Sequence, residues 1–206
     1  MKLSVGFGRI SQMIRPGLFP PFRASFQRLL PARRTWLKAL HGAMIPLVIW
    51  FMVATPDVVR SIFGPQGAEI NSKIALVFVT LVTLWSIDYF RRGLAGRPGP
   101  KLPPKLRRFH RVLHKTLLYM LFMIPVGGLL LGITASRQLW AGGIVPLGIP
   151  LSMPQANAII GKLHIYQFYA LGLIVLVHAG FHIWRHRALR DNTLRIMAPK
   201  ILHRFL

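Results

Sequence analysis

Four long apolar runs, separated by basic segments, constrain the fold of this 206-residue chain more than any other feature. Each run has about 17–22 residues, enough for a helix to cross a hydrocarbon core of about 30 Å. Backbone N–H and C=O groups find no water inside lipid, so such runs must form helices. We therefore predict an all-α fold, a transmembrane four-helix bundle. Its spans are expected at 39–55, 74–90, 112–133 and 163–184.

The basic residues indicate which helix ends face the cytoplasm. Of the 27 Lys and Arg residues, 23 lie before the first span, from Arg91 to Lys115 up to the first turn of the third span, or after the fourth span. The positive-inside rule places these segments, and both termini, in the cytoplasm. The connection 136–161 is rich in Gly and Pro and nearly uncharged. It is expected on the outer side, folded against the membrane surface or over the bundle.

The same pattern predicts three parts of the chain: a basic cytoplasmic N-terminal extension at 1–38, a four-helix transmembrane domain at 39–186, and a basic cytoplasmic tail at 187–206. The net charge of +23 could suggest nucleic acid as a partner. However, the charges flank apolar runs, where Lys and Arg meet anionic lipid head groups. The lipid bilayer is therefore the expected partner, and nucleic acid is not.

Composition excludes several kinds of chemistry. The chain has no cysteine, so disulfides, iron–sulfur clusters and Cys-ligated zinc are excluded. Four acidic residues leave little material for paired-carboxylate catalysis or carboxylate-rich metal sites. The eight histidines remain as the carriers of chemistry.

The positions of the histidines favour a cofactor between the helices. His164 and His178 are fourteen residues apart, which places them on one helix face and about 21 Å apart along its axis. His41 falls near the cytoplasmic end of the first span and can face His178 if the first and fourth spans are neighbours. Imidazoles from two facing helices can hold a haem iron between them. The alternative is that these are interfacial residues near helix ends, a reading that suits His110 and His186 best.

The end of the chain resembles bacterial cytochrome b561, the family of four-helix di-haem membrane proteins that includes the superoxide oxidase. The segment "LHIYQFYALGLIVLVHAGFHIWRHRALRDNTLRIMAP" is similar to the family's fourth span and the residues that follow it. The matching residues are His164, His178, His186, Asp191, Asn192, Thr193, Leu194, Met197 and Pro199. The third span is similar through His114, Tyr119, Pro125 and Gly128, and the first span through its Leu-His opening.

This resemblance implies a membrane cytochrome b with His41 and His178 as axial ligands of a haem b iron near the cytoplasm. In the family, a second haem nearer the outside uses the counterpart of His164 and a histidine early in the second span. Here no histidine lies between His41 and His110, and the region that corresponds to the family's second-span histidine reads "EINSKIALVFVT". We therefore expect one haem b. A second haem would be absent, would be five-coordinate with His164 as its axial ligand, or would take a replacement axial ligand such as Met153.

Depth in the membrane favours His182 over His178 as the haem ligand opposite His41. His182 is three residues from Arg185, matching the three residues between Lys38 and His41. His178 is about one helical turn deeper, roughly 6 Å, which helix tilt can absorb. The gapless resemblance favours His178 as the axial haem ligand, with His182 as the alternative.

The function implied by the resemblance is electron transport in the bacterial inner membrane. The chain would be a multi-pass, haem-containing, metal-binding oxidoreductase linked to quinone, with ubiquinone as a candidate and superoxide:quinone oxidoreductase activity as one version. An alternative is a cytochrome b or accessory subunit of a larger respiratory or photosynthetic complex, with the N-terminal extension as a docking arm. A third reading is a haem-free structural membrane protein.

Overall fold

The computed structural model describes residues 32–95, 99, 101–197 and 203–204. Four long helices dominate this part of the chain: α2 (Arg33–Val53), α4 (Gly67–Arg92), α5 (Pro104–Thr134) and α6 (Pro154–Ala188). Each lies in a helical segment long and apolar enough to cross a membrane. The predicted all-α fold with four membrane-length helices is confirmed, and the chain is a multi-pass membrane protein. Most of the predicted extension 1–38 lies outside the described residues.

The helices extend beyond the apolar runs that predicted them. Helix α5 begins at Pro104 and α6 begins at Pro154, both before the expected spans. Proline suits the first turn of a helix because its missing N–H would have no partner there. Pro46 and Pro125 lie inside α2 and α5, and both helices continue through them.

A short helix, α3 (Pro56–Phe63), was not predicted. The Thr55 side chain accepts a hydrogen bond from the Val58 N–H, which caps the start of α3. The turn η1 (Gly64–Gln66) then leads into α4. A side chain at Gly67 would meet the Val59 carbonyl oxygen at 2.8 Å, so the missing Cβ allows α3 to pack closely on the start of α4.

The core contains buried side chains from all four long helices. Its buried members are Met44, Val48, Phe78, Val82, Leu121, Ile124 and Leu171. Three aromatic rings fill its middle: the ring centre of Phe51 lies 5.3 Å from that of Phe78 and 5.5 Å from that of Phe168. Many large apolar side chains outside this core are exposed, as expected for helices that face lipid.

Between α5 and α6, a small hairpin packs on α4. Strand β1 (Trp140–Ala141) pairs antiparallel with β2 (Val145–Pro146). The Ser72 hydroxyl donates to the Trp140 carbonyl at 3.2 Å and accepts from the Gly142 N–H at 2.8 Å. The connection 136–161 was expected to fold either against the membrane surface or over the bundle. Its contact with α4 agrees with the second position.

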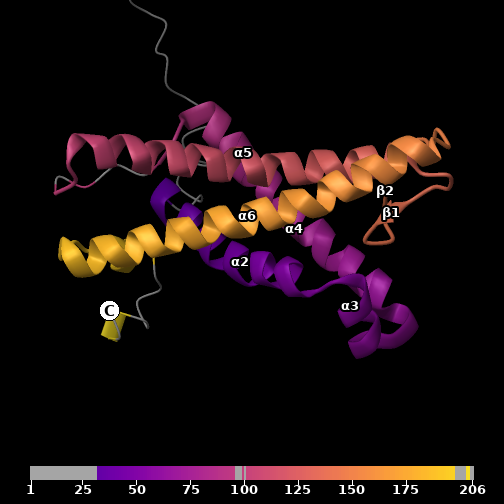
Figure 1. Cartoon of the computed structure of the whole chain (residues 1–206), viewed down its shortest axis with the longest axis horizontal. Helices are drawn as coiled ribbons and strands as arrows, with labels where there is room; N and C mark the ends of the chain where they lie inside the picture. The colour runs from indigo at the N-terminus through magenta and orange to yellow at the C-terminus, as the bar shows by residue number, and fades with distance from the viewer. Residues whose placement is uncertain (1–31, 96–98, 100, 198–202, 205–206) are drawn as a thin grey trace, which may run out of the picture. The chain divides into compact units, whose positions relative to one another are not determined.

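Helices α5 and α6 run side by side for most of their length (Figure 1). At one end, the Asn157 side-chain amide donates to the Leu131 carbonyl and to the Thr134 hydroxyl, both at 2.9 Å. At the other end, α6 is followed by the short helix α7 (Thr193–Met197). This pairing brings the histidines of the two helices together.

Candidate functional site

His41 of α2 and His178 of α6 face each other in the helix bundle. Their ring centres are 6.4 Å apart, and the indole of Trp85 from α4 lies 6.2 Å from His41. Two imidazoles that bind one metal ion at about 2 Å each have ring centres about 6 Å apart. The separation of the two ring centres therefore matches that of two imidazoles that bind one metal ion on opposite sides.

A second group of imidazoles lies between α5 and α6. His110 and His114 are one turn apart on α5, with ring centres separated by 4.1 Å. His182 of α6 lies 5.6 Å from His110 and 5.3 Å from His114. Each of the three offers a nitrogen atom within 4.8 Å of the others. We call His110, His114 and His182 the histidine triad.

His178 belongs to both groups, since its ring centre is 4.5 Å from His182 and 4.8 Å from His114. The structure thus brings His178 and its rival His182 into one cluster. It places His178 beside His41, and His182 with the two histidines of α5.

Several imidazole nitrogen atoms of this cluster are buried without forming a hydrogen bond to the described residues. His114 Nδ1 lies 2.7 Å from the His110 carbonyl oxygen, so a proton on Nδ1 would be donated there and leave Nε2 as an acceptor. The His110 Nδ1, His178 Nδ1 and His182 Nε2 atoms are buried and find no hydrogen-bond partner among the residues that the structure describes. Buried polar atoms without partners are uncommon in proteins, and here they point to a ligand.

His164 lies far from this cluster, nearer the start of α6. Its Nδ1 is 3.1 Å from the Gln167 Oε1, and its ring centre is 5.3 Å from that of Phe168. The imidazole covers Gly127 of α5, where an added Cβ would approach the His164 Nδ1 to 2.6 Å. His164 is therefore held by a neighbouring side chain and by a close helix contact.

Met153, the expected replacement ligand, is not placed beside His164. It caps the start of α6 and is exposed. Eleven residues separate it from His164 on the same helix, a rise of roughly 16 Å. A different methionine, Met52 of α2, packs against Gly172 of α6.

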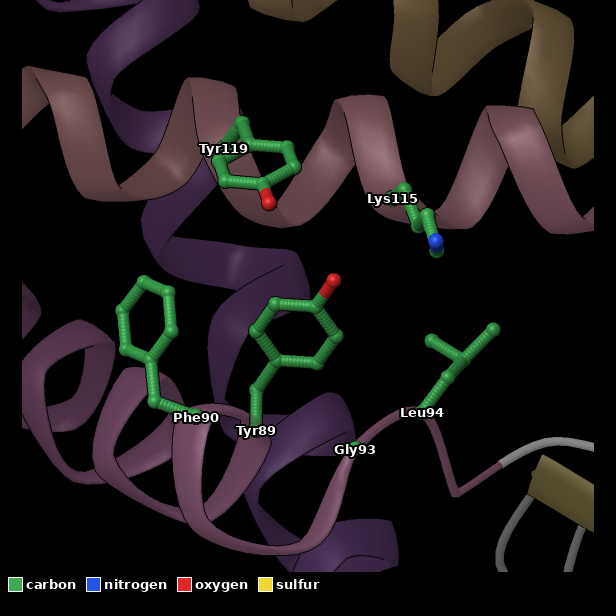
Figure 2. Close-up of a pocket in the computed structure, with 6 residues that line it drawn as sticks. All are labelled: Tyr89, Phe90, Gly93, Leu94, Lys115 and Tyr119. Carbon is green, nitrogen blue, oxygen red and sulfur yellow. The ribbon is translucent and has the colours of Figure 1, made fainter.

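An open hollow of about 410 Å³ lies between α4 and α5 (Figure 2). The hydroxyl groups of Tyr89 and Tyr119 point toward each other across it, and their ring centres are 6.2 Å apart. Lys115 lies one turn before Tyr119 and follows His114 directly in the sequence. The hollow therefore offers two hydroxyl groups and one ammonium group near the histidine cluster.

A buried ion pair closes the end of α6 next to the triad. The Arg185 guanidinium donates to Asp191 Oδ2 from Nη2 at 2.6 Å and from Nε at 3.0 Å. The Thr193 N–H and hydroxyl both donate to Asp191 Oδ1. Burial acts to raise the pKa of the Asp191 carboxyl, but the hydrogen bonds from Thr193 and Arg185 outweigh it and lower the pKa.

No family model matches this chain, and no curated protein matches it.

Two features of this site, the histidine triad and the hollow between α4 and α5, were not predicted from the sequence. His110 and His114, like His178 and His182, are four residues apart, which places each pair on one helix face. That spacing could have predicted the triad, had the pairing of α5 with α6 been known. The two tyrosines of the hollow are 30 residues apart and carry no such local signal.

Proposed function

We propose that this chain is a membrane electron-transfer protein that binds haem b and exchanges electrons with quinone. The observation that carries the proposal is the facing pair His41 and His178, with ring centres 6.4 Å apart. Ionisable side chains within a membrane are costly and are kept where they serve a function. Haem, when bound, supplies reversible one-electron transfer.

The residues of the chain would set the properties of this cofactor. His41 and His178 would hold the iron, and Trp85 packs edge-on against the His41 ring. Apolar side chains around the core exclude water, which shapes the reduction potential. The many Lys and Arg residues near the proposed cytoplasmic end add positive charge, which favours the reduced state.

The hollow formed by Tyr89, Tyr119 and Lys115 is the proposed quinone site. A quinone has two carbonyl oxygens that accept hydrogen bonds, and its tail is apolar. The two tyrosine hydroxyls can donate to a carbonyl oxygen, and exposed Phe90 offers an apolar edge to the tail. Reduction of a quinone to a quinol also consumes protons, for which the open side of the hollow gives access.

The side-chain packing around His164 supports a proposal with one haem group and not two. The middle of the core is filled by Phe51, Phe78 and Phe168, and Phe168 contacts His164. His164 has Gln167 as a hydrogen-bond partner. Superoxide oxidation through two haems across the bilayer is therefore not part of the proposal.

The test of the haem ligands is the visible spectrum of the purified chain. His41→Ala and His178→Ala should each abolish the low-spin bis-imidazole absorption. His182→Ala should keep it, and His203→Ala, in the tail, serves as the control. Wild-type spectra from both of the first two variants would contradict the assignment.

The quinone site is tested by steady-state kinetics with a short-chain quinol. Tyr89→Phe and Tyr119→Phe each remove one hydroxyl and should raise KM by about 10-fold, the worth of one hydrogen bond. The haem spectrum should not change. Tyr166→Phe, at an exposed position on α6, is the matched control and should leave KM unaltered.

A further inference from the structure

We propose that the histidine triad, His110, His114 and His182, binds a divalent transition-metal ion separate from the haem. Three imidazoles from two helices converge with nitrogen atoms within 4.8 Å of one another. The site does not depend on the proposed electron-transfer function, because its ligands are not the proposed haem ligands.

The separation of the nitrogen atoms suits a metal ion after small side-chain movements. In a tetrahedral site with metal–nitrogen distances of about 2.0–2.1 Å, ligand nitrogens lie about 3.4 Å apart. Rotation about χ2 of histidine is soft, so the imidazoles can close from 4.8 Å without backbone movement.

The hydrogen bonds of the triad leave nitrogen atoms free to coordinate. A proton on His114 Nδ1 would be donated to the His110 carbonyl at 2.7 Å, which is how metal-binding histidines are commonly oriented. His110 Nδ1 and His182 Nε2 are buried, and no described residue forms a hydrogen bond with either atom. A metal ion would satisfy both atoms.

The surroundings select the class of metal. The triad contains only neutral-nitrogen donors, which suit Zn²⁺, Cu²⁺ or Ni²⁺ rather than Mg²⁺ or Ca²⁺. The nearby Arg185 is 4% exposed, and its charge is paired with Asp191. This pairing reduces the repulsion that a cation would meet at the triad.

Three protein ligands leave a fourth position for water or another small ligand. The metal would tie α5 to α6 one turn from His178, whose ring centre is 4.5 Å from His182. The ion would therefore sit next to the proposed haem ligand without sharing it.

The test measures zinc bound to the full-length chain, purified in detergent through a tag without histidines. After treatment with a chelator, the protein is equilibrated with Zn²⁺, and zinc and haem are counted per polypeptide. We expect about one zinc per wild-type chain. His110→Gln, His114→Ala and His182→Ala should each weaken zinc binding by at least about 100-fold. His203→Ala, the matched control, should bind as the wild type does.

The outcomes separate this inference from the proposed function. Zinc bound at the triad of a chain that holds no haem supports the site while the electron-transfer proposal fails. No zinc above the level that all variants share overturns the site, whatever the haem content. Loss of both zinc and the low-spin haem spectrum in His182→Ala would assign His182 to the haem and also overturn the site. A size-exclusion profile in detergent and a Tm like those of the wild type show that His110→Gln is folded, whether or not the chain holds haem.

Discussion

Arg185 and Asp191 form a buried, two-point ion pair where α6 ends, with Arg185 Nη2 2.6 Å from Asp191 Oδ2. Around it, the Lys101 ammonium donates to the carbonyls of Leu189 and Arg190, at 3.2 and 3.1 Å. An added Cβ at Gly99 would lie 3.0 Å from Arg185 Nη2. The pair therefore joins the connection between α4 and α5 to the end of α6.

Removing the carboxylate should destabilise the protein. Asp191→Ala leaves the Arg185 guanidinium buried without its partner, which costs about 3 kcal/mol in comparable buried pairs. We expect a clear fall in Tm, measured by thermal unfolding in detergent. Glu69→Gln breaks the exposed Lys73–Glu69 pair, and exposed pairs contribute about 0–1 kcal/mol. Equal losses of Tm in the two variants would contradict the role of the buried pair.

Stability should depend on acid pH through the same carboxyl. The pKa of Asp191 is lowered in the folded protein, whereas an unfolded Asp titrates near about 3.9. The stabilisation is therefore complete above the unfolded pKa and is lost as pH falls through the folded pKa. Tm measured from pH 7 to pH 3 should fall more steeply below about pH 4 in the wild type than in Asp191→Asn. Parallel curves would contradict this prediction.

A methyl group at Gly127 should displace His164. The added Cβ would lie 2.6 Å from both His164 Nδ1 and Gln167 Oε1, and overpacking of this kind costs about 1–3 kcal/mol. If the only haem lies between His41 and His178, the visible spectrum should remain while Tm falls.

Gly128→Ala is the matched control, because its Cβ would meet only His164 Cε1 at 4.0 Å, an ordinary contact. Haem analysis of the wild type should give one haem per chain. A count near two, both low-spin, with one lost in Gly127→Ala, would return His164 to the set of haem ligands.

The predicted orientation is tested by reporters fused at two places. One follows Leu206, and the other replaces Gly143, where the hairpin has open space around the Cα atom. With both termini in the cytoplasm, the reporter after Leu206 should be active only in its cytoplasmic form. The one at Gly143 should be active only in its periplasmic form. The reverse pattern would overturn the charge-based orientation.

The sequence predicted the existence of the helices better than their lengths. Apolar content marks only the lipid-facing middle, so 163–184 was expected where α6 runs from Pro154 to Ala188. Polar residues at both ends continue the helix because the backbone hydrogen bonds continue. The short helix α3 was missed, although Thr55 and Pro56 carry recognisable start signals.

For the candidate site, the sequence indicated that histidines carry the chemistry, and it indicated part of their arrangement on the helices. His41 and His178 could face each other if the first and fourth spans were neighbours, and in the structure their ring centres lie 6.4 Å apart. Whether they bind haem stays a prediction. The meeting of His110 and His114 with His182 depends on the pairing of α5 with α6, which no local pattern in the sequence reports.

The ligands of the proposed haem come from the first and last membrane helices, and this has a consequence for biogenesis. His41 is synthesised before α4 and α5, whereas His178 is synthesised after both of them. A nascent chain halted in the connection between α5 and α6 would carry one of the two imidazoles. The cofactor would therefore be captured after α6 is inserted, and its loading would report that all four of these helices are in place.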